Sequence, residues 1–305
     1  MLNGKTIYHS MIESAILSGC SIWTLTKSNI ALMKSIQYRA AQAVLQLKCK
    51  PTRPALLGDL GWTPIDLTIE KRQIAYFKYL KFDLAHSSLP HKVLTHLIKQ
   101  HSEGNEAPWK YVSNIKSILI KRGLDDVLFR DDCEWYNTYE GICRQERTTN
   151  FIDDISHFKS LNTYSTFKNH PYQENYLKQD FDFYGSRLKF LARTNNFCLE
   201  SNYSVWGKSD GKCKLCSLNV HEDLQHRLLL CEHFKEERES FFHTVCKQCP
   251  SDLFSDFIKG NLTEKLTFIL GDETFSKWGQ DYFRLFDSIV KSFLTQVYKP
   301  RDLCL

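Results

Sequence analysis

The residues best suited to chemistry in this 305-residue chain are cysteines and histidines gathered in one short segment. Five of the 11 cysteines and four of the 11 histidines lie within residues 213–249. Cys213, Cys216, His226 and Cys231 follow the pattern C-x2-C-x9-H-x4-C. Two thiolates three residues apart can face one ion from a tight turn, and the later His and Cys can complete a tetrahedron. Three thiolates with one imidazole favour Zn2+, so the sequence predicts a structural zinc site with no open position.

Spacing alone leaves other ligand sets open. His221 lies midway between Cys216 and His226, so a set that includes it has the spacing of a short knuckle. Cys246 and Cys249 form a second C-x2-C pair that could join the first. The 29 residues between the two pairs exceed the roughly 15 to 20 that are usual for such ribbons, which disfavours a four-cysteine site. Buried free thiols without a metal are the remaining interpretation.

Basic residues are concentrated in two parts of the chain. The total formal charge is only +5, but residues 1–130 carry 18 Lys and Arg against nine Asp and Glu. Residues 183–221, which lead into the metal motif, have a net charge of +4. Such zones either contact nucleic-acid phosphates or solvate the outer faces of helices. The predicted nucleic-acid contacts are Arg187, Lys189, Arg193, Trp206, Lys208, Lys212 and Lys214.

Trp206 and two arginines near the motif each have two interpretations. The indole of Trp206 either stacks on a base or anchors a core beside the metal site. Arg227 and Arg238 either contact phosphates or pair with neighbouring carboxylates such as Glu222 and Asp223.

The amino terminus indicates the compartment. The apolar run from Met11 to Leu25 is interrupted by polar residues and shows no cleavage site, so we expect no secretory signal. No window reaches the roughly 18 apolar residues that a membrane helix needs. We therefore expect an intracellular protein of the cytoplasm or nucleus, without a membrane partner, whose cysteines are thiols or ligands. The oligomeric state does not follow from the sequence.

Apolar periodicity predicts a mainly α fold, with helical bundles and one small zinc-bound module. Tyr111–Leu119 fits either a helix or a strand, and Ser102–Pro108 and Asn195–Asp210 are the predicted linkers. The predicted helices are 28–47, 68–84, 91–101, 223–234 and 283–297.

Three stretches resemble the region downstream of the polymerase core in non-LTR (LINE-type) retrotransposon reverse transcriptases. Tyr8–Trp23 is similar to the thumb segment of that family, and Leu57–Ile65 is similar to its acidic-Leu-Gly-x-x-Pro turn. Ser18 and Asp59 stand where the family more often has Tyr and Glu. Cys213–Arg238 resembles its carboxy-terminal CCHC zinc element.

The resemblance implies a domain order and a partner, RNA or DNA. The implied segments are a thumb-like helical segment (1–65), a helical linker domain (66–200), a CCHC zinc module (201–250) and C-terminal helices (251–305).

The palm of a polymerase is missing from this chain. Two or three carboxylates must hold the metal ions of such an enzyme, and the family places two of them in an aromatic-x-Asp-Asp hairpin. The string Phe151-Ile152-Asp153-Asp154 matches, but it follows the thumb-like segment and lacks flanking strands, so we interpret it as a coincidence in which the aspartates begin or cap a helix. We therefore predict no enzyme, but a noncatalytic nucleic-acid-binding fragment. The alternative is a structural or protein-interaction zinc module, for which the aromatic stripe of 283–297 would be a docking face.

Overall fold

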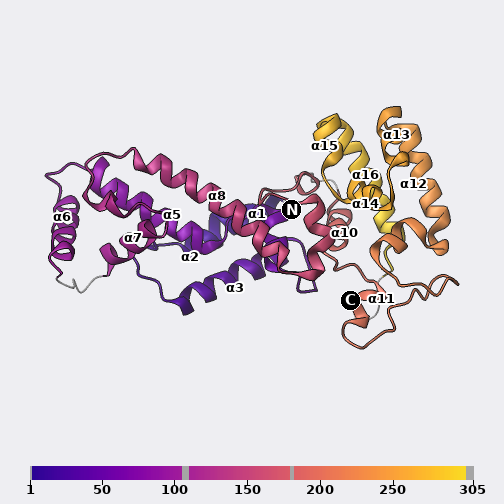
Figure 1. Ribbon diagram of the computed structural model, residues 1–305, viewed down its shortest axis with the longest axis horizontal. Helices are drawn as coiled ribbons and strands as arrows, with labels where there is room; N and C mark the ends of the chain where they lie inside the picture. The colour runs from indigo at the N-terminus through magenta and orange to yellow at the C-terminus, as the bar shows by residue number, and fades with distance from the viewer. Residues whose placement is uncertain (1, 105–109, 179–181, 300–305) are drawn as a thin grey trace. The chain divides into compact units, whose positions relative to one another are not determined.

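The computed structural model describes residues 2–104, 110–178 and 182–299 (Figure 1). The fold is mainly α, as predicted, and the described residues contain no strand beyond an isolated antiparallel bridge between Lys212 and His221. The chain divides into two compact units. Unit 1 contains Met1–Gly4, Ala41–Trp62 and Phe151–Leu305, and unit 2 contains Lys5–Ala40 and Thr63–Asn150. Each unit combines stretches that are far apart in sequence, because amphipathic helices bury their apolar faces against distant segments. The four predicted segments, in contrast, each run without interruption along the chain.

Unit 2 is built around the helices that the periodicity predicts. The predicted helix 28–47 is α3, 68–84 is α5 with η2, and 91–101 is α6. The ambiguous stretch at Tyr111 is helical. The hydrophobic core of unit 2 contains the buried side chains of Phe77, Ile115 and Trp135. The elements that begin before residue 151, outside α4, are α1 (Leu2–Ile7), η1 (Tyr8–Glu13), α2 (Ser14–Ile16), α3 (Lys27–Val44), α5 (Ile65–Lys78), η2 (Tyr79–Asp83), α6 (Leu89–Ser102), α7 (Tyr111–Ile120), η3 (Asp125–Phe129) and α8 (Trp135–Ser156).

Unit 1 carries the metal motif beside a phenylalanine-rich core. The predicted carboxy-terminal helix is α16, which packs on α10 and α12 (Figure 1). The ring centroids of Phe241 on α12 and Phe293 on α16 are 4.6 Å apart. The elements are α4 (Arg53–Leu60), η4 (Lys159–Leu161), α9 (Asn162–Phe167), η5 (Asn175–Leu177), α10 (Phe183–Arg193), α11 (Glu200–Ser204), η6 (His226–Leu230), η7 (Glu232–Phe234), α12 (Lys235–Gln248), α13 (Ser251–Lys259), α14 (Leu262–Leu270), α15 (Glu273–Trp278) and α16 (Gln280–Val297).

A buried ionic network centres on Asp59, at the end of α4. Its carboxylate accepts hydrogen bonds from the hydroxyls of Tyr164 and Tyr176, both at 2.7 Å, and from Arg193 Nε at 3.0 Å. Arg193 Nη2 also lies 2.9 Å from a carboxylate oxygen of Glu174. Burial alone would raise the pKa of Asp59, but the neighbouring cations and hydroxyls hold it below its usual value.

A second buried ionic group joins α10 to α16. Asp287 lies 2.7 Å from Lys189 Nζ and 2.6 Å from Lys291 Nζ. Burial opposes ionisation of Asp287, yet the two ammonium groups lower the pKa of this carboxyl below its usual value. The charged group is therefore part of the packing between the two helices.

Two local predictions are corrected by the structure. Asp153 and Asp154 lie in the last turn of α8, so they neither begin nor cap a helix, and the matching string is helical. Asn195–Asp210 is no loose linker, because it contains α11 and the buried Phe197. Residues 105–108 of the other predicted linker lie outside the described residues.

Candidate metal centre

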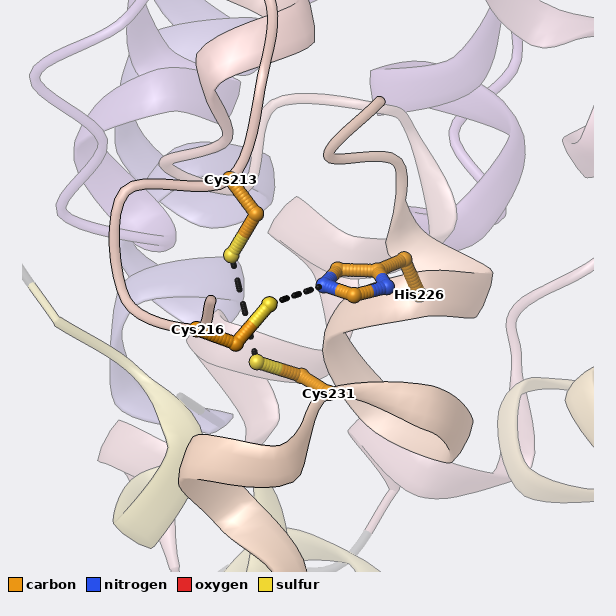
Figure 2. Close-up of side chains that lie close together, drawn as sticks. All are labelled: Cys213, Cys216, His226 and Cys231. Atoms are coloured by element: carbon orange, nitrogen blue, oxygen red, sulfur yellow. Dashed lines mark hydrogen bonds between the residues drawn. The ribbon is translucent and has the colours of Figure 1, made fainter. Parts of the chain in front are cut away.

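A short hairpin holds the first two ligands, and we call residues 211–222 the knuckle. The Cys213 amide donates to the Val220 carbonyl, and the Glu222 amide donates to the Gly211 carbonyl, both at 2.9 Å. Gly211 has φ of 77°, which is the left-handed region that favours glycine. These bonds close the chain on itself, so that Cys213 and Cys216 face the same side (Figure 2).

A π-helical turn, η6, carries His226, and Cys231 follows it directly. The Cys231 amide donates to the His226 carbonyl at 2.7 Å, which is a five-residue step. An α-helix would rotate residues five apart by about 140°, at about 100° per residue. The wider π turn instead returns the chain to nearly the same side. The predicted helix over 223–234 is therefore only partly correct, because the structure has a π turn over His226–Leu230 and a 3-10 turn over Glu232–Phe234, separated at Cys231.

The four predicted ligands converge on one point (Figure 2). All four ligand atoms lie within 4.8 Å of one another. The Sγ atoms of Cys213 and Cys231 are 3.9 Å apart, and Cys216 Sγ lies 3.5 Å from His226 Nε2. A tetrahedral ion with metal–sulfur bonds of about 2.3 Å and a metal–nitrogen bond of about 2.0 Å requires about 3.8 Å and about 3.5 Å. These two distances match a four-coordinate site, and the group as a whole could hold a metal ion.

The surroundings of the cluster suit a cation. Burial raises the pKa of the Cys213 thiol to about 12 and also raises the pKa of Cys231. Burial lowers the pKa of His226, which favours the neutral imidazole that ligates metals. A bound cation would supply the positive charge that thiolates need in this buried position.

Neighbouring polar groups fix the ligands in place. The Asp223 carboxylate accepts a hydrogen bond from the His226 amide at 2.7 Å, as an N-terminal helix cap does. Glu222 lies 3.5 Å from Cys213 Sγ and pairs with Arg227 at 2.6 Å. Sequence inspection did not assign Asp223 this role, although an Asp three residues before a turn is a capping signal. No sequence signal indicated the contact of Glu222 with Cys213.

The two arginines of this region have structural contacts. Arg227 is buried and paired with Glu222, as the second of its two interpretations predicts. Arg238 Nη1 donates to the Cys231 carbonyl at 3.0 Å.

The other ligand sets do not assemble in the parts of the chain that the structure describes. His221 is exposed on the knuckle, opposite Lys212. Cys246 is exposed on α12, whereas Cys249 is buried in the unit 1 core. None of the three belongs to the convergent group.

The predicted nucleic-acid contacts separate into a buried and an exposed set. Lys189 and Arg193 are buried in the two ionic groups of unit 1, so a structural role replaces their predicted contact with nucleic acid. Arg187 is half-buried, with its guanidinium 4.9 Å from the ring of Tyr184. The exposed set is Trp206, Lys208, Lys212 and Lys214.

Trp206 is not a core anchor. Its side chain is 66% exposed, which rules out that interpretation in this structure.

The basic amino-terminal zone is partly neutralised within unit 2. Lys34 pairs with Asp66, Lys121 pairs with Glu146, and Arg122 pairs with Glu70 and Glu146. Lys27, Arg39, Arg72 and Lys92 are exposed.

No protein-family model matches the chain, and no curated protein or solved structure matches it either. None of the helices in the described residues has the length and apolar composition required to cross a membrane.

Proposed function

We propose that this chain is a noncatalytic nucleic-acid-binding fragment whose CCHC module is held together by zinc. The single observation that carries the proposal is the exposed indole of Trp206 with Lys208 Nζ 5.9 Å from its ring, in the same module as the convergent metal-ligand group. Exposed aromatic rings with nearby cations are typical of surfaces that bind nucleic acids.

Zinc is the ion that the ligand set favours. Three thiolates and one imidazole in tetrahedral array suit Zn2+ and leave no coordination position for a substrate. We expect one zinc per chain in the purified protein, measured by elemental analysis. Cobalt substitution should give the visible absorption of a tetrahedral, thiolate-rich site.

Descent from a non-LTR reverse transcriptase is the origin we propose for this fragment. Its support is the resemblance of Tyr8–Trp23, Leu57–Ile65 and Cys213–Arg238 to the region downstream of the polymerase core. The helical setting of Asp153 and Asp154 supports the noncatalytic part, because a polymerase carboxylate pair needs a hairpin.

The proposal is tested by anisotropy of labelled RNA and DNA with matched charge variants. Replacing Lys208, Lys212 and Lys214 together by Glu should weaken binding to every nucleic acid at least tenfold, because each phosphate contact contributes counterion release. The control variant replaces three lysines that are exposed on α12 and α13 by Glu, namely Lys235, Lys247 and Lys259. It should bind nucleic acid with the affinity of the wild type. Equal effects of the two triple variants, or no binding by the wild type, would refute the proposal.

The alternative is a structural or protein-interaction module. The aromatic stripe of α16 no longer favours it, because Phe283, Phe286 and Phe293 are buried within unit 1. The exposed apolar side chains of Leu218 and Val220 on the knuckle are the observation that keeps it as a second candidate. It would gain support from a wild-type chain that holds zinc but binds no nucleic acid.

A further inference from the structure

We infer that the metal module binds single-stranded nucleic acid by stacking an unpaired base on Trp206, with Lys208, Lys212 and Lys214 facing the adjoining phosphates. The inference rests on the proposed function and specifies the class of ligand. Its support is the turn that carries Trp206, the contacts between α11 and the knuckle, and the lysines of residues 205–221.

The indole is fixed at the end of a short helix. Helix α11 ends at Ser204, and the turn that follows it closes at a left-handed glycine, Gly207, with φ of 66°. The amide of Lys208 donates to the Tyr203 carbonyl at 3.1 Å, and the amide of Gly207 donates to the Ser204 carbonyl at 3.0 Å. Such a helix end is well defined, so Trp206 projects from a fixed backbone position.

The contact of Trp206 with its buried neighbour leaves the indole available for stacking. The rings of Trp206 and Tyr203 meet at 79°, with centroids 6.1 Å apart. This edge-on contact orients the indole without stacking a second ring on it. Lys208 Nζ lies over the indole ring, 5.9 Å from its centroid, so a cation already lies beside the ring on which a base would stack.

The knuckle supports α11, the helix that directly precedes the turn with Trp206. The Glu200 amide donates to the Glu222 carboxylate at 2.7 Å, and the Ser201 amide donates to the Glu222 carbonyl at 3.4 Å. A Cβ at Gly211 would lie 3.3 Å from the Ser204 side chain, so the two segments pack closely. Assembly of the metal site therefore sets the position of the indole relative to Lys212 and Lys214.

The local charge favours a single strand over a duplex. Residues 205–221 contain three lysines and one acidic residue, Asp210, whose carboxylate accepts a hydrogen bond from the Lys212 amide. Lys214 also lies 3.6 Å from the buried Glu200. So few cations give a duplex little to bind, because duplex affinity without base contacts depends on many phosphate contacts. Bases of a duplex are already stacked, whereas an unpaired base offers its face to the indole.

A protein partner fits this surface less well. The lysines beside the indole would lose their hydration in an apolar interface, and interface cores are depleted in lysine. Flexible single strands keep their phosphates in water while one base stacks. The surface therefore matches a single strand better than an apolar protein face.

The test compares Trp206→Ala with Val205→Ala in the full chain. Val205 is 81% exposed and adjacent, so its truncation removes exposed apolar surface without removing an aromatic ring. The probes are labelled oligouridine, oligothymidine and a mixed-sequence duplex of the same length. We expect Trp206→Ala to weaken single-strand binding by about 5- to 150-fold, the range for loss of one base–aromatic stack. Val205→Ala should change binding less than about threefold, and Trp206→Phe should retain part of the affinity.

The outcomes separate this inference from the proposed function. If Trp206→Ala weakens the binding of single strands and duplex equally, or of neither, while the triple variant of Lys208, Lys212 and Lys214 still loses binding, the inference is wrong and the proposed function stands. If the wild type binds none of the probes, both are wrong. Zinc content and the circular dichroism spectrum of each variant confirm that the module is folded.

Discussion

Removal of the metal should unfold the knuckle and leave the helical core of unit 1 folded. Among residues 205–222, only Gly211, Cys213 and Glu222 are buried. Helix α16, in contrast, buries nine side chains, including three phenylalanines. The two segments therefore depend on different sources of stability.

The magnitude follows from the ordering of the knuckle. Fixing the backbone of residues 211–222 costs about 12 kcal/mol, at the lower estimate of about 1 kcal/mol per residue. Burial of the Cys213 side chain returns only about 1 kcal/mol. A structural zinc ion contributes about 10–16 kcal/mol, which is enough to offset the difference. Without it, the knuckle should be open most of the time.

Hydrogen exchange read by mass spectrometry can locate the change. After chelation, peptides from residues 205–222 should lose all protection, whereas peptides from α16 should exchange as before. Cys213→Ser should reproduce this pattern, and Cys246→Ser should not, because Cys246 is exposed and outside the ligand group. Unchanged protection of the knuckle in protein shown to be free of metal would refute the assignment.

Three further predictions concern the stability of unit 1, measured by urea unfolding with wild type and variant at the same metal content. Arg193→Leu removes the cation shared by two buried carboxylates, Asp59 and Glu174, and should cost about 3–5 kcal/mol of unfolding free energy. Replacement of the half-buried Arg187 by Leu should cost less than about 1 kcal/mol, and equal losses would contradict the buried network. The fold lowers the pKa of Asp287, so the charged carboxylate stabilises the protein fully above the ordinary pKa of about 4, and this stabilisation is lost as the pH falls further. The difference in unfolding free energy between the wild type and Asp287→Asn should therefore narrow from pH 7 to pH 3. A difference that stays constant would exclude a charged Asp287. Gly61→Ala would place a Cβ against the backbone nitrogen of Gln173, whereas a Cβ at Gly207 would meet no atom within 4 Å. Gly207→Ala should therefore lower the unfolding free energy by about 1 kcal/mol, and Gly61→Ala should lower it by more. The reverse order would refute this packing.

The ligand group could be predicted because metal chemistry limits the residue types and their spacing. The C-x2-C pair and the later His and Cys indicated Cys213, Cys216, His226 and Cys231 as one of the possible ligand sets, and the structure brings these four together. The π turn was not predictable from apolar periodicity, since the run from Leu228 to Leu230 fits an α-helix equally well. The choice between His226 and His221 required the backbone, because both spacings occur in metal sites.

The charge pattern was less informative, because a count of basic residues does not show which of them reach solvent. Lys189 and Arg193 are four residues apart on α10 and share its buried face, and their partners Asp287 and Asp59 lie 98 and 134 residues away in sequence. Because Lys189 and Arg193 are buried, they are no longer predicted phosphate contacts, and the salt dependence expected for nucleic-acid binding is weaker. With Lys208, Lys212 and Lys214 facing a single strand, the slope of log K against log salt should be about −2, which is about a 20-fold loss of affinity between about 50 and 200 mM salt. A much steeper slope would mean that exposed cations of unit 2, such as Lys27 and Arg39, also contact the strand.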